Sequence, residues 1–112
     1  MRIAIPLALG RLSQHFGHCE SFALLDVDQA AKKIIGKQEL ESPEHQPGLL
    51  PQWLAEKGAA LIIAGGMGAS AQRLFAEKGI QVVTGAPAET PETLVADFMA
   101  GTLRTGGNRC DH

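Results

Sequence analysis

The side chains best suited to metal chemistry gather in a few short segments of the sequence. One segment reads His15-Phe16-Gly17-His18-Cys19, a second region contains His45, and the chain ends in Cys110-Asp111-His112. Imidazole nitrogen and thiolate sulfur are the ligands that zinc, copper and iron–sulfur centres prefer. A turn in the first segment would bring its ligands to one metal, and an extended end would point Cys110 and His112 to the same side. The predicted metal ligands are His15, His18, Cys19, His45, Cys110 and His112.

Each of these residues also has an interpretation that needs no metal. Cys19 would then be a small buried hydrophobic residue at the entry to a strand, and His18 a loop residue bonded to the backbone. The Cys110 and His112 pair would belong to a disordered tail. The spacing matches neither a paired CxxC site nor a zinc finger. The pattern therefore leaves open whether an iron–sulfur or molybdenum-containing cluster, or a single zinc or copper ion, is bound.

A glycine-rich turn forms the second candidate feature. Gly65, Gly66, Met67 and Gly68 lie between an apolar segment and a predicted helix. Glycines allow backbone N–H groups to approach a ligand, and a helix start favours negative charge. The turn matches neither the Walker A motif nor the dinucleotide fingerprint, and a tight turn that needs glycine for its dihedral angles is the alternative. Taken alone, these residues favour the tight turn, and Gly65, Gly66, Met67 and Gly68 are kept as candidate cofactor-binding residues. No nucleophile–base pair or carboxylate pair is evident in the sequence, so we expect a protein that is not an enzyme.

The elements that must position these residues follow from hydrophobic periodicity. Alternating or continuous apolar runs predict strands at 3–7, 22–27, 33–40, 60–64 and 80–83, with the polar third strand at a sheet edge. Three helices should follow the third, fourth and fifth strands in turn and end at Gly58, Gly79 and Gly101. The second helix should turn Ala71, Leu74 and Phe75 inward, and Thr90 should cap the third. The order is β-β-β-α-β-α-β-α, which predicts an α/β fold with an antiparallel meander, two parallel strands and a five-stranded mixed sheet.

Composition limits the class of protein. The chain has 112 residues, of which 45% are hydrophobic, and ten basic residues against twelve acidic ones give a net charge of −2. No dense basic stretch indicates a nucleic-acid partner, and the apolar run at 59–64 is far shorter than the roughly 20 residues of a membrane span. Two distant cysteines do not form a disulfide framework. We expect one cytoplasmic domain over 1–103 and a flexible tail over 104–112, with no nucleic-acid or membrane partner.

The order of several motifs resembles one known family. The segment at 15–19 leads into the strand at 22–27, and the Pro47-Gly48-Leu49-Leu50-Pro51 loop follows. The Gly66-Met67-Gly68-x-x-Ala71 turn and the stretch 74–82 complete the set. Together they resemble the dinitrogenase iron–molybdenum cofactor biosynthesis family, of the NifX and NifB C-terminal type. The resemblance covers nearly the whole chain up to Leu103. The sequence has no radical-SAM cysteine motif, and the tail with Cys110 and His112 matches no motif of the family.

The resemblance implies a ribonuclease-H-like, three-layer α/β/α fold and the binding or carriage of an iron–sulfur or molybdenum-containing cluster. It also implies that His15, His18 and Cys19, with Gly66, Met67 and Gly68, form the edge that faces the cluster. Partners would be proteins that donate or accept the cofactor, and a homodimer is left open. Stand-alone members also occur outside nitrogen fixation. A mononuclear zinc or copper protein for sensing or storage, and a metal-free protein-interaction module, are the alternatives.

Overall fold

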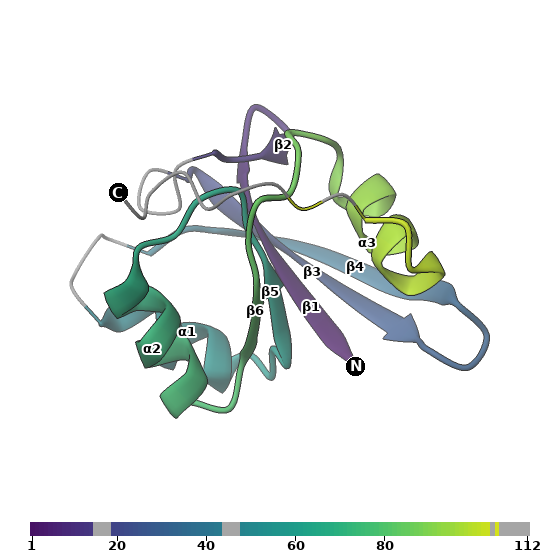
Figure 1. Cartoon of the computed structure of the whole chain (residues 1–112). Coiled ribbons are helices and arrows are strands. Elements are labelled where there is room, and N and C mark those ends of the chain that lie inside the picture. Colours follow the sequence, from purple (N-terminus) through teal and green to yellow (C-terminus); the bar gives the residue numbers. More distant parts are fainter. Residues whose placement is uncertain (15–18, 44–47, 104, 106–112) are drawn as a thin grey trace.

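The computed structural model describes residues 1–14, 19–43, 48–103 and 105. The described chain builds one mixed sheet whose strands lie in the order β4-β3-β1-β5-β6 (Figure 1). These strands are β1 (Arg2–Ala8), β3 (Ser21–Asp28), β4 (Lys33–Glu41), β5 (Leu61–Ile63) and β6 (Gln81–Val83). The strands β1, β3 and β4 pair antiparallel, whereas β1, β5 and β6 pair parallel. The predicted meander, the parallel pair and the polar edge strand are confirmed.

The predicted count of five strands is wrong, because the described sheet contains a sixth strand. This strand, β2 (Arg11–Leu12), pairs antiparallel with the end of β1 in a region predicted to be a loop. Ala8 pairs with Arg11, so only Leu9 and Gly10 form the turn, and both have positive φ angles of 55° and 78°. A two-residue hairpin turn with this backbone sends the chain straight back along the strand. The buried side chain of Leu12, 3% exposed, adds to one core cluster.

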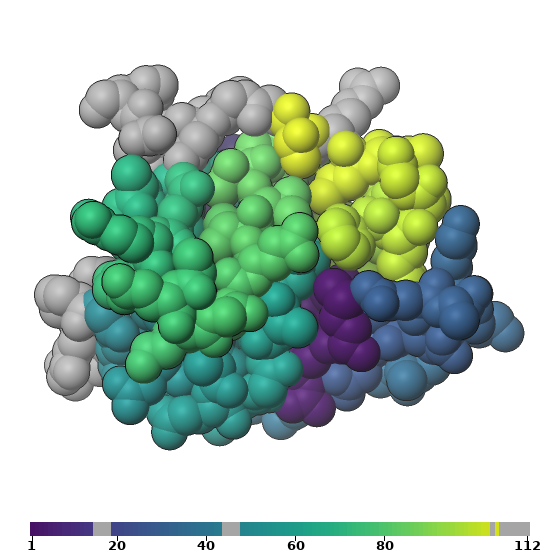
Figure 2. All heavy atoms as spheres, turned by 60° about the horizontal axis from the view of Figure 1, so that its bottom comes forward, coloured from purple at the N-terminus to yellow at the C-terminus, as the bar shows by residue number. Residues whose placement is uncertain are grey.

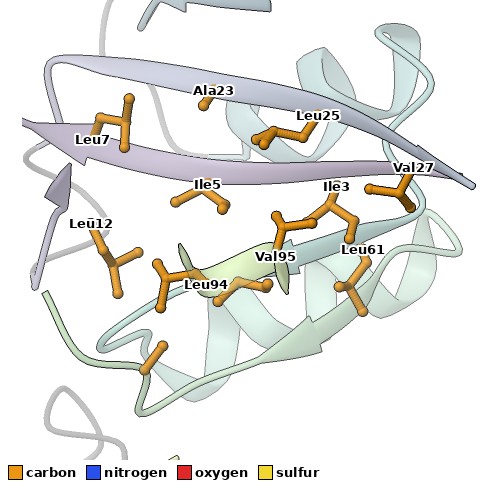
Figure 3. Close-up of a cluster of buried hydrophobic side chains, with 12 residues drawn as sticks. Ile3, Ile5, Leu7, Leu12, Ala23, Leu25, Val27, Leu61, Leu94 and Val95 are labelled. Atoms are coloured by element: carbon orange, nitrogen blue, oxygen red, sulfur yellow. The ribbon is translucent and has the colours of Figure 1, made fainter. Parts of the chain in front are cut away.

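Three helices cover the two faces of the sheet. The helices α1 (Leu49–Glu56) and α2 (Ala69–Glu77) lie on one face, and α3 (Pro91–Ala100) lies on the other (Figure 1). Alternation along β1 supplies both cores, because Ile3 and Ile5 face α3 while Ala4 faces α1 and α2. Figure 3 shows Leu94 and Val95 of α3 directed toward the side chains of β1. The mixed α/β fold with layers in the order helix, sheet, helix is therefore established, and its ribonuclease-H-like class stays a prediction.

The helices end where the glycines predict, but α2 is less buried than its pattern indicates. Gly58, Gly79 and Gly101 all have positive φ angles, and Thr90 caps α3 by accepting a hydrogen bond from the Thr93 N–H. In α2 the side chain of Phe75 is fully buried, whereas Leu74, predicted to face inward, is 37% exposed. The short β6, which α2 packs against, forms the second edge of the sheet, and Figure 2 shows the green segment containing it at the surface between α2 and α3.

Arg2 connects three elements at the amino end of β1. Its guanidinium donates two hydrogen bonds to the Asp26 carboxylate on β3, at 2.8 and 3.3 Å, and a third to the Lys57 carbonyl after α1. We call this group the Arg2 clamp.

None of the helices in the described part of the chain has the length and apolar character that crossing a membrane requires.

Candidate functional site

The candidate site lies at the end of the sheet where the parallel strands β1, β5 and β6 finish. The antiparallel strands bring two more segments to this end, because Leu7 pairs with Ser21 at the start of β3 and Ser21 pairs with Glu41 at the end of β4. In open α/β sheets, ligands bind in the crevice outside the carboxyl ends of the parallel strands. We call this region the carboxyl end of the sheet.

Cys19 lies at the carboxyl end, two residues before β3 begins. Its side chain is half-buried and packs against the core between the sheet and helices α1 and α2. Its thiol donates a hydrogen bond to the Ser42 hydroxyl, with 3.9 Å between sulfur and oxygen. Burial raises the pKa of the Cys19 thiol above its usual range, and the Ser42 hydrogen bond partly offsets that rise. Burial thus favours the neutral thiol, and a soft metal at this sulfur would have to displace the thiol proton.

The glycine-rich turn is attached to neighbouring segments on both sides. The Ala64 N–H donates to the Val83 carbonyl at 2.8 Å, and the Gly65 carbonyl accepts from the Gly85 N–H at 2.6 Å. On the other side the Gly66 N–H donates to the Gln14 carbonyl at 3.2 Å. The turn thus continues the β5 ladder beyond the strand itself. In this conformation the Gly66 amide is engaged with the Gln14 carbonyl, so this N–H is not available to a ligand.

Met67 and Gly68 differ in what they present at the turn. The Met67 side chain is 1% exposed and belongs to the core beneath α1 and α2, so it supports the turn from below. Gly68 is the N-cap residue of α2, and no side chain caps this helix or places an acid in its first turn. A β carbon at Gly68 would meet no described atom within 4 Å. The first turn of α2 therefore offers its positive dipole end next to open space at the carboxyl end.

The predicted histidine ligands lie outside the described residues. This applies to His15, His18 and His45, and equally to Cys110 and His112 in the tail. Their convergence on one metal stays a prediction, but the residues that flank two of the segments are placed. Gln14 and Cys19 border residues 15–18, and Pro43 borders residues 44–47 immediately after Ser42, whose N–H donates to the Glu20 carbonyl at 3.1 Å. In the part of the chain that the structure describes, no three His, Cys, Asp or Glu side chains form a metal-binding group.

Two features of this end have no counterpart in the sequence interpretation. Ser42 reaches Cys19 from the far end of a nine-residue strand, and only the register of β3 and β4 shows this. Leu9 at the tip of the β1–β2 hairpin is 91% exposed, and its N–H donates to the Glu20 carboxylate at 2.9 Å. The Leu9-Gly10 pair carries no typical turn signal, since asparagine or glycine is the usual first residue of such a hairpin turn.

Comparison with known proteins identifies the family. The family model described as dinitrogenase iron-molybdenum cofactor matches residues 1–101. The chain belongs to this family. The assignment of this chain to the dinitrogenase iron-molybdenum cofactor family from its motif order is thus confirmed, and the matched range includes Cys19 and the glycine-rich turn but not residues 102–112.

One curated protein and two solved structures illustrate what this chain is similar to. An uncharacterised protein of Methanocaldococcus jannaschii, MJ0580, is 33% identical over 85 residues, which cover 73% of this chain and 72% of the relative. The crystal structure of PH0822 has a TM-score of 0.86 at 29% identity and covers 94% of both chains. The apo form of the orange protein from Desulfovibrio gigas has a TM-score of 0.73 over 96% of this chain and 93% of its own, and at 23% identity it shows a shared fold alone.

Proposed function

We propose that this protein binds and carries an iron–sulfur or molybdenum-containing cluster at the carboxyl end of the sheet, and that it is not an enzyme. One observation carries the proposal. The fold brings Cys19, the glycine-rich turn and the flanks of the segments that contain His15, His18 and His45 to the same end of the sheet. The family assignment supports this type of cargo, because the description of the family names the dinitrogenase iron-molybdenum cofactor.

The described groups at this end suit a sulfide-containing cluster. A thiolate from Cys19 is a soft donor for iron, copper or molybdenum, and histidines nearby would add nitrogen ligands. Such clusters carry negative charge, which the uncapped first turn of α2 favours. No described atom lies within 4 Å of the position that a β carbon at Gly68 would occupy, so described side chains do not block the approach to this turn. The residues present therefore fit the proposed cargo.

The same groups argue against catalysis on a bound substrate. Burial raises the pKa of the half-buried Cys19 thiol, which is the opposite of what activates a cysteine as a nucleophile. A binding protein of this kind would work by receiving the cluster from one protein and passing it to another. Its partners would then be cofactor-donating and cofactor-accepting proteins, with no role for nucleic acid or a membrane.

The decisive experiment is metal and acid-labile sulfide analysis of the full chain, purified and reconstituted without oxygen. Iron or molybdenum with sulfide, together with visible absorption, would support the proposal. The Cys19→Ser variant should lose most of the bound metal. Cys110→Ser is the matched control that tests the tail, since it removes the same atom from a residue outside the family match.

Two other outcomes would contradict the proposed cluster. Zinc or copper bound without sulfide would assign a mononuclear site to the same residues, with a role in sensing or storage. A parent protein that binds neither metal nor sulfide after reconstitution would leave a protein-interaction module. A parent that binds the cluster while Cys19→Ser binds it equally well would exclude Cys19 as a ligand.

A further inference from the structure

At Gly65 a side chain is disfavoured by the close approach of Gln14 and not by a left-handed backbone conformation. Gly65 is not among the described glycines with positive φ, such as Gly10 and Gly58. A β carbon at Gly65 would lie 3.1 Å from the Cα of Gln14, and 3.2 and 3.3 Å from Oε1 and Cδ of the same residue. The side-chain atoms could rotate away, but the Cα could move only with its backbone. An alanine here would therefore push the two segments apart.

Neither segment is free to retreat from such an overlap. The Gly65 carbonyl accepts a hydrogen bond from the Gly85 N–H at 2.6 Å, which holds the turn from the side of β6. The segment of Gln14 is held in turn by the Ser13 N–H, which donates to the Pro6 carbonyl at 2.9 Å. The hydrogen bond from the Gly66 N–H to the Gln14 carbonyl closes the contact between them. The segments around Pro6, Gln14, Gly65 and Gly85 are thus joined by hydrogen bonds, each to the next.

The contact joins two parts of the proposed site that are distant in the sequence. Gln14 immediately precedes the segment that begins with His15, and Gly65 immediately precedes Gly66, Met67 and Gly68. We infer that Gly65 is a positioning residue whose missing side chain sets the separation between Gln14, the residue before His15, and the glycine-rich turn. Gly65 need not touch the cluster for this role. The inference rests on the proposed function for the meaning of that separation.

The test compares Gly65→Ala with Gly36→Ala in the full chain. Gly36 also lacks a positive φ, and a β carbon there would meet Asp26 at 3.5 and 3.7 Å, which is ordinary contact on β4, far from the site. One readout needs no metal, namely amide hydrogen exchange at Gly66. The other is the amount of iron and sulfide taken up on anaerobic reconstitution, checked by the visible spectrum.

Gly65→Ala should speed exchange at Gly66 by about tenfold or more and should lower cluster uptake severalfold, because the overlap breaks the hydrogen bond to Gln14. Gly36→Ala should match the parent in both readouts. If Gly65→Ala does not fold, Gln14→Gly reaches the same contact from the other side, because it loosens the backbone ahead of His15 without adding atoms. It should also speed exchange at Gly66 and lower uptake.

The failures of the two proposals can be told apart. A folded Gly65→Ala protein that keeps Gly66 protected, or that takes up as much iron and sulfide as Gly36→Ala, would overturn the positioning role. A parent protein that takes up no cluster would instead overturn the proposed function and, with it, the role of Gly65 at that site. Exchange at Gly66 would in that case still decide whether Gly65 holds the two segments together.

Discussion

The Cys19 thiol donates a hydrogen bond to the Ser42 hydroxyl over 3.9 Å, and this contact joins the approach to β3 with the end of β4. The backbone supports the same junction, because the Ser42 N–H donates to the carbonyl of Glu20, the residue after Cys19. The sulfur thus lies between the Ser42 hydroxyl on one side and the core on the other. Its chemistry is set by these two surroundings.

The first prediction concerns the reactivity of Cys19 in the metal-free protein. Burial raises the pKa of its thiol, so little thiolate exists at pH 7 and alkylation by iodoacetamide should be slow. The rate should keep rising with pH beyond about 8.5, where an ordinary cysteine is already half ionised. The measurement is a pH–rate profile in a Cys110→Ser background, so that only Cys19 reacts. A profile that levels off at or below the ordinary range would contradict the burial of the sulfur.

Ser42→Ala provides the control for the cause of that shift. The Ser42 hydroxyl lowers the thiol pKa, because after ionisation the hydroxyl can turn and donate a hydrogen bond that stabilises the thiolate. Removing it should move the profile further toward high pH and slow alkylation at every pH below the midpoint. Faster alkylation in Ser42→Ala would mean that the hydroxyl shields the sulfur more than it stabilises the charge.

The second prediction concerns strain at the hairpin tip. Leu9 has a φ of 55° and its side chain is 91% exposed, so it bears the cost of a left-handed backbone without gaining burial. Leu9→Asn should stabilise the fold by about 1 kcal/mol, or about 4 °C in Tm, because asparagine adopts this conformation more readily. Leu9→Ala keeps the strain and should leave Tm nearly unchanged. A lower Tm for Leu9→Asn would show that the leucine side chain stabilises the folded chain.

The third prediction concerns the Arg2 clamp in acid. The hydrogen bonds from Arg2 hold the pKa of the Asp26 carboxyl below its usual range. A depressed folded-state pKa contributes stability that is present above the unfolded-state pKa and is lost as the pH falls through the folded-state pKa. Tm of the parent should therefore fall more steeply than Tm of Asp26→Asn below about pH 4. Arg2→Gln should behave like Asp26→Asn, and the double variant should add little to either.

The fourth prediction concerns α2, the helix that begins after the glycine-rich turn. Phe75 is the fully buried side chain of α2, so Phe75→Ala should destabilise the protein by about 3–5 kcal/mol. Its neighbour Leu74 is 37% exposed, and Leu74→Ala should cost about 1 kcal/mol or less. Denaturant unfolding of both variants measures the difference. Similar losses would mean that Leu74 packs as the periodicity predicts.

The sheet could be predicted because its strands differ in how many faces they bury. The segment at 22–27 is apolar on both faces and is central, whereas the charged segment at 33–40 lies at the edge. The sixth strand was missed because two residues show no periodicity, and its hairpin turn begins with a leucine. Leu74 was misplaced for a related reason: a nine-residue helix with one anchoring aromatic side chain does not need a wide apolar face.

The sequence indicates which residues are suited to the site but not how these residues contact one another. Cys19 carries a signal in its chemistry, and so does the glycine-rich turn, but neither sequence pattern shows that Ser42 approaches the sulfur or that Gln14 packs on Gly65. Those contacts depend on strand register and on loops from distant parts of the chain. Cys19 also fits the alternative interpretation in part, because its side chain packs against the core as a small hydrophobic residue would.

The Arg2 clamp and the carboxyl end lie at opposite ends of β1, and this separation has a consequence for how such a domain can change. Arg2 ties β1, β3 and the end of α1 together at one end, while Leu7 and Ala8 deliver the chain to the segments of the proposed site at the other. Substitutions and length changes in those segments fall away from the clamp, so we expect that natural variation or design can alter the proposed cargo without first redesigning the scaffold.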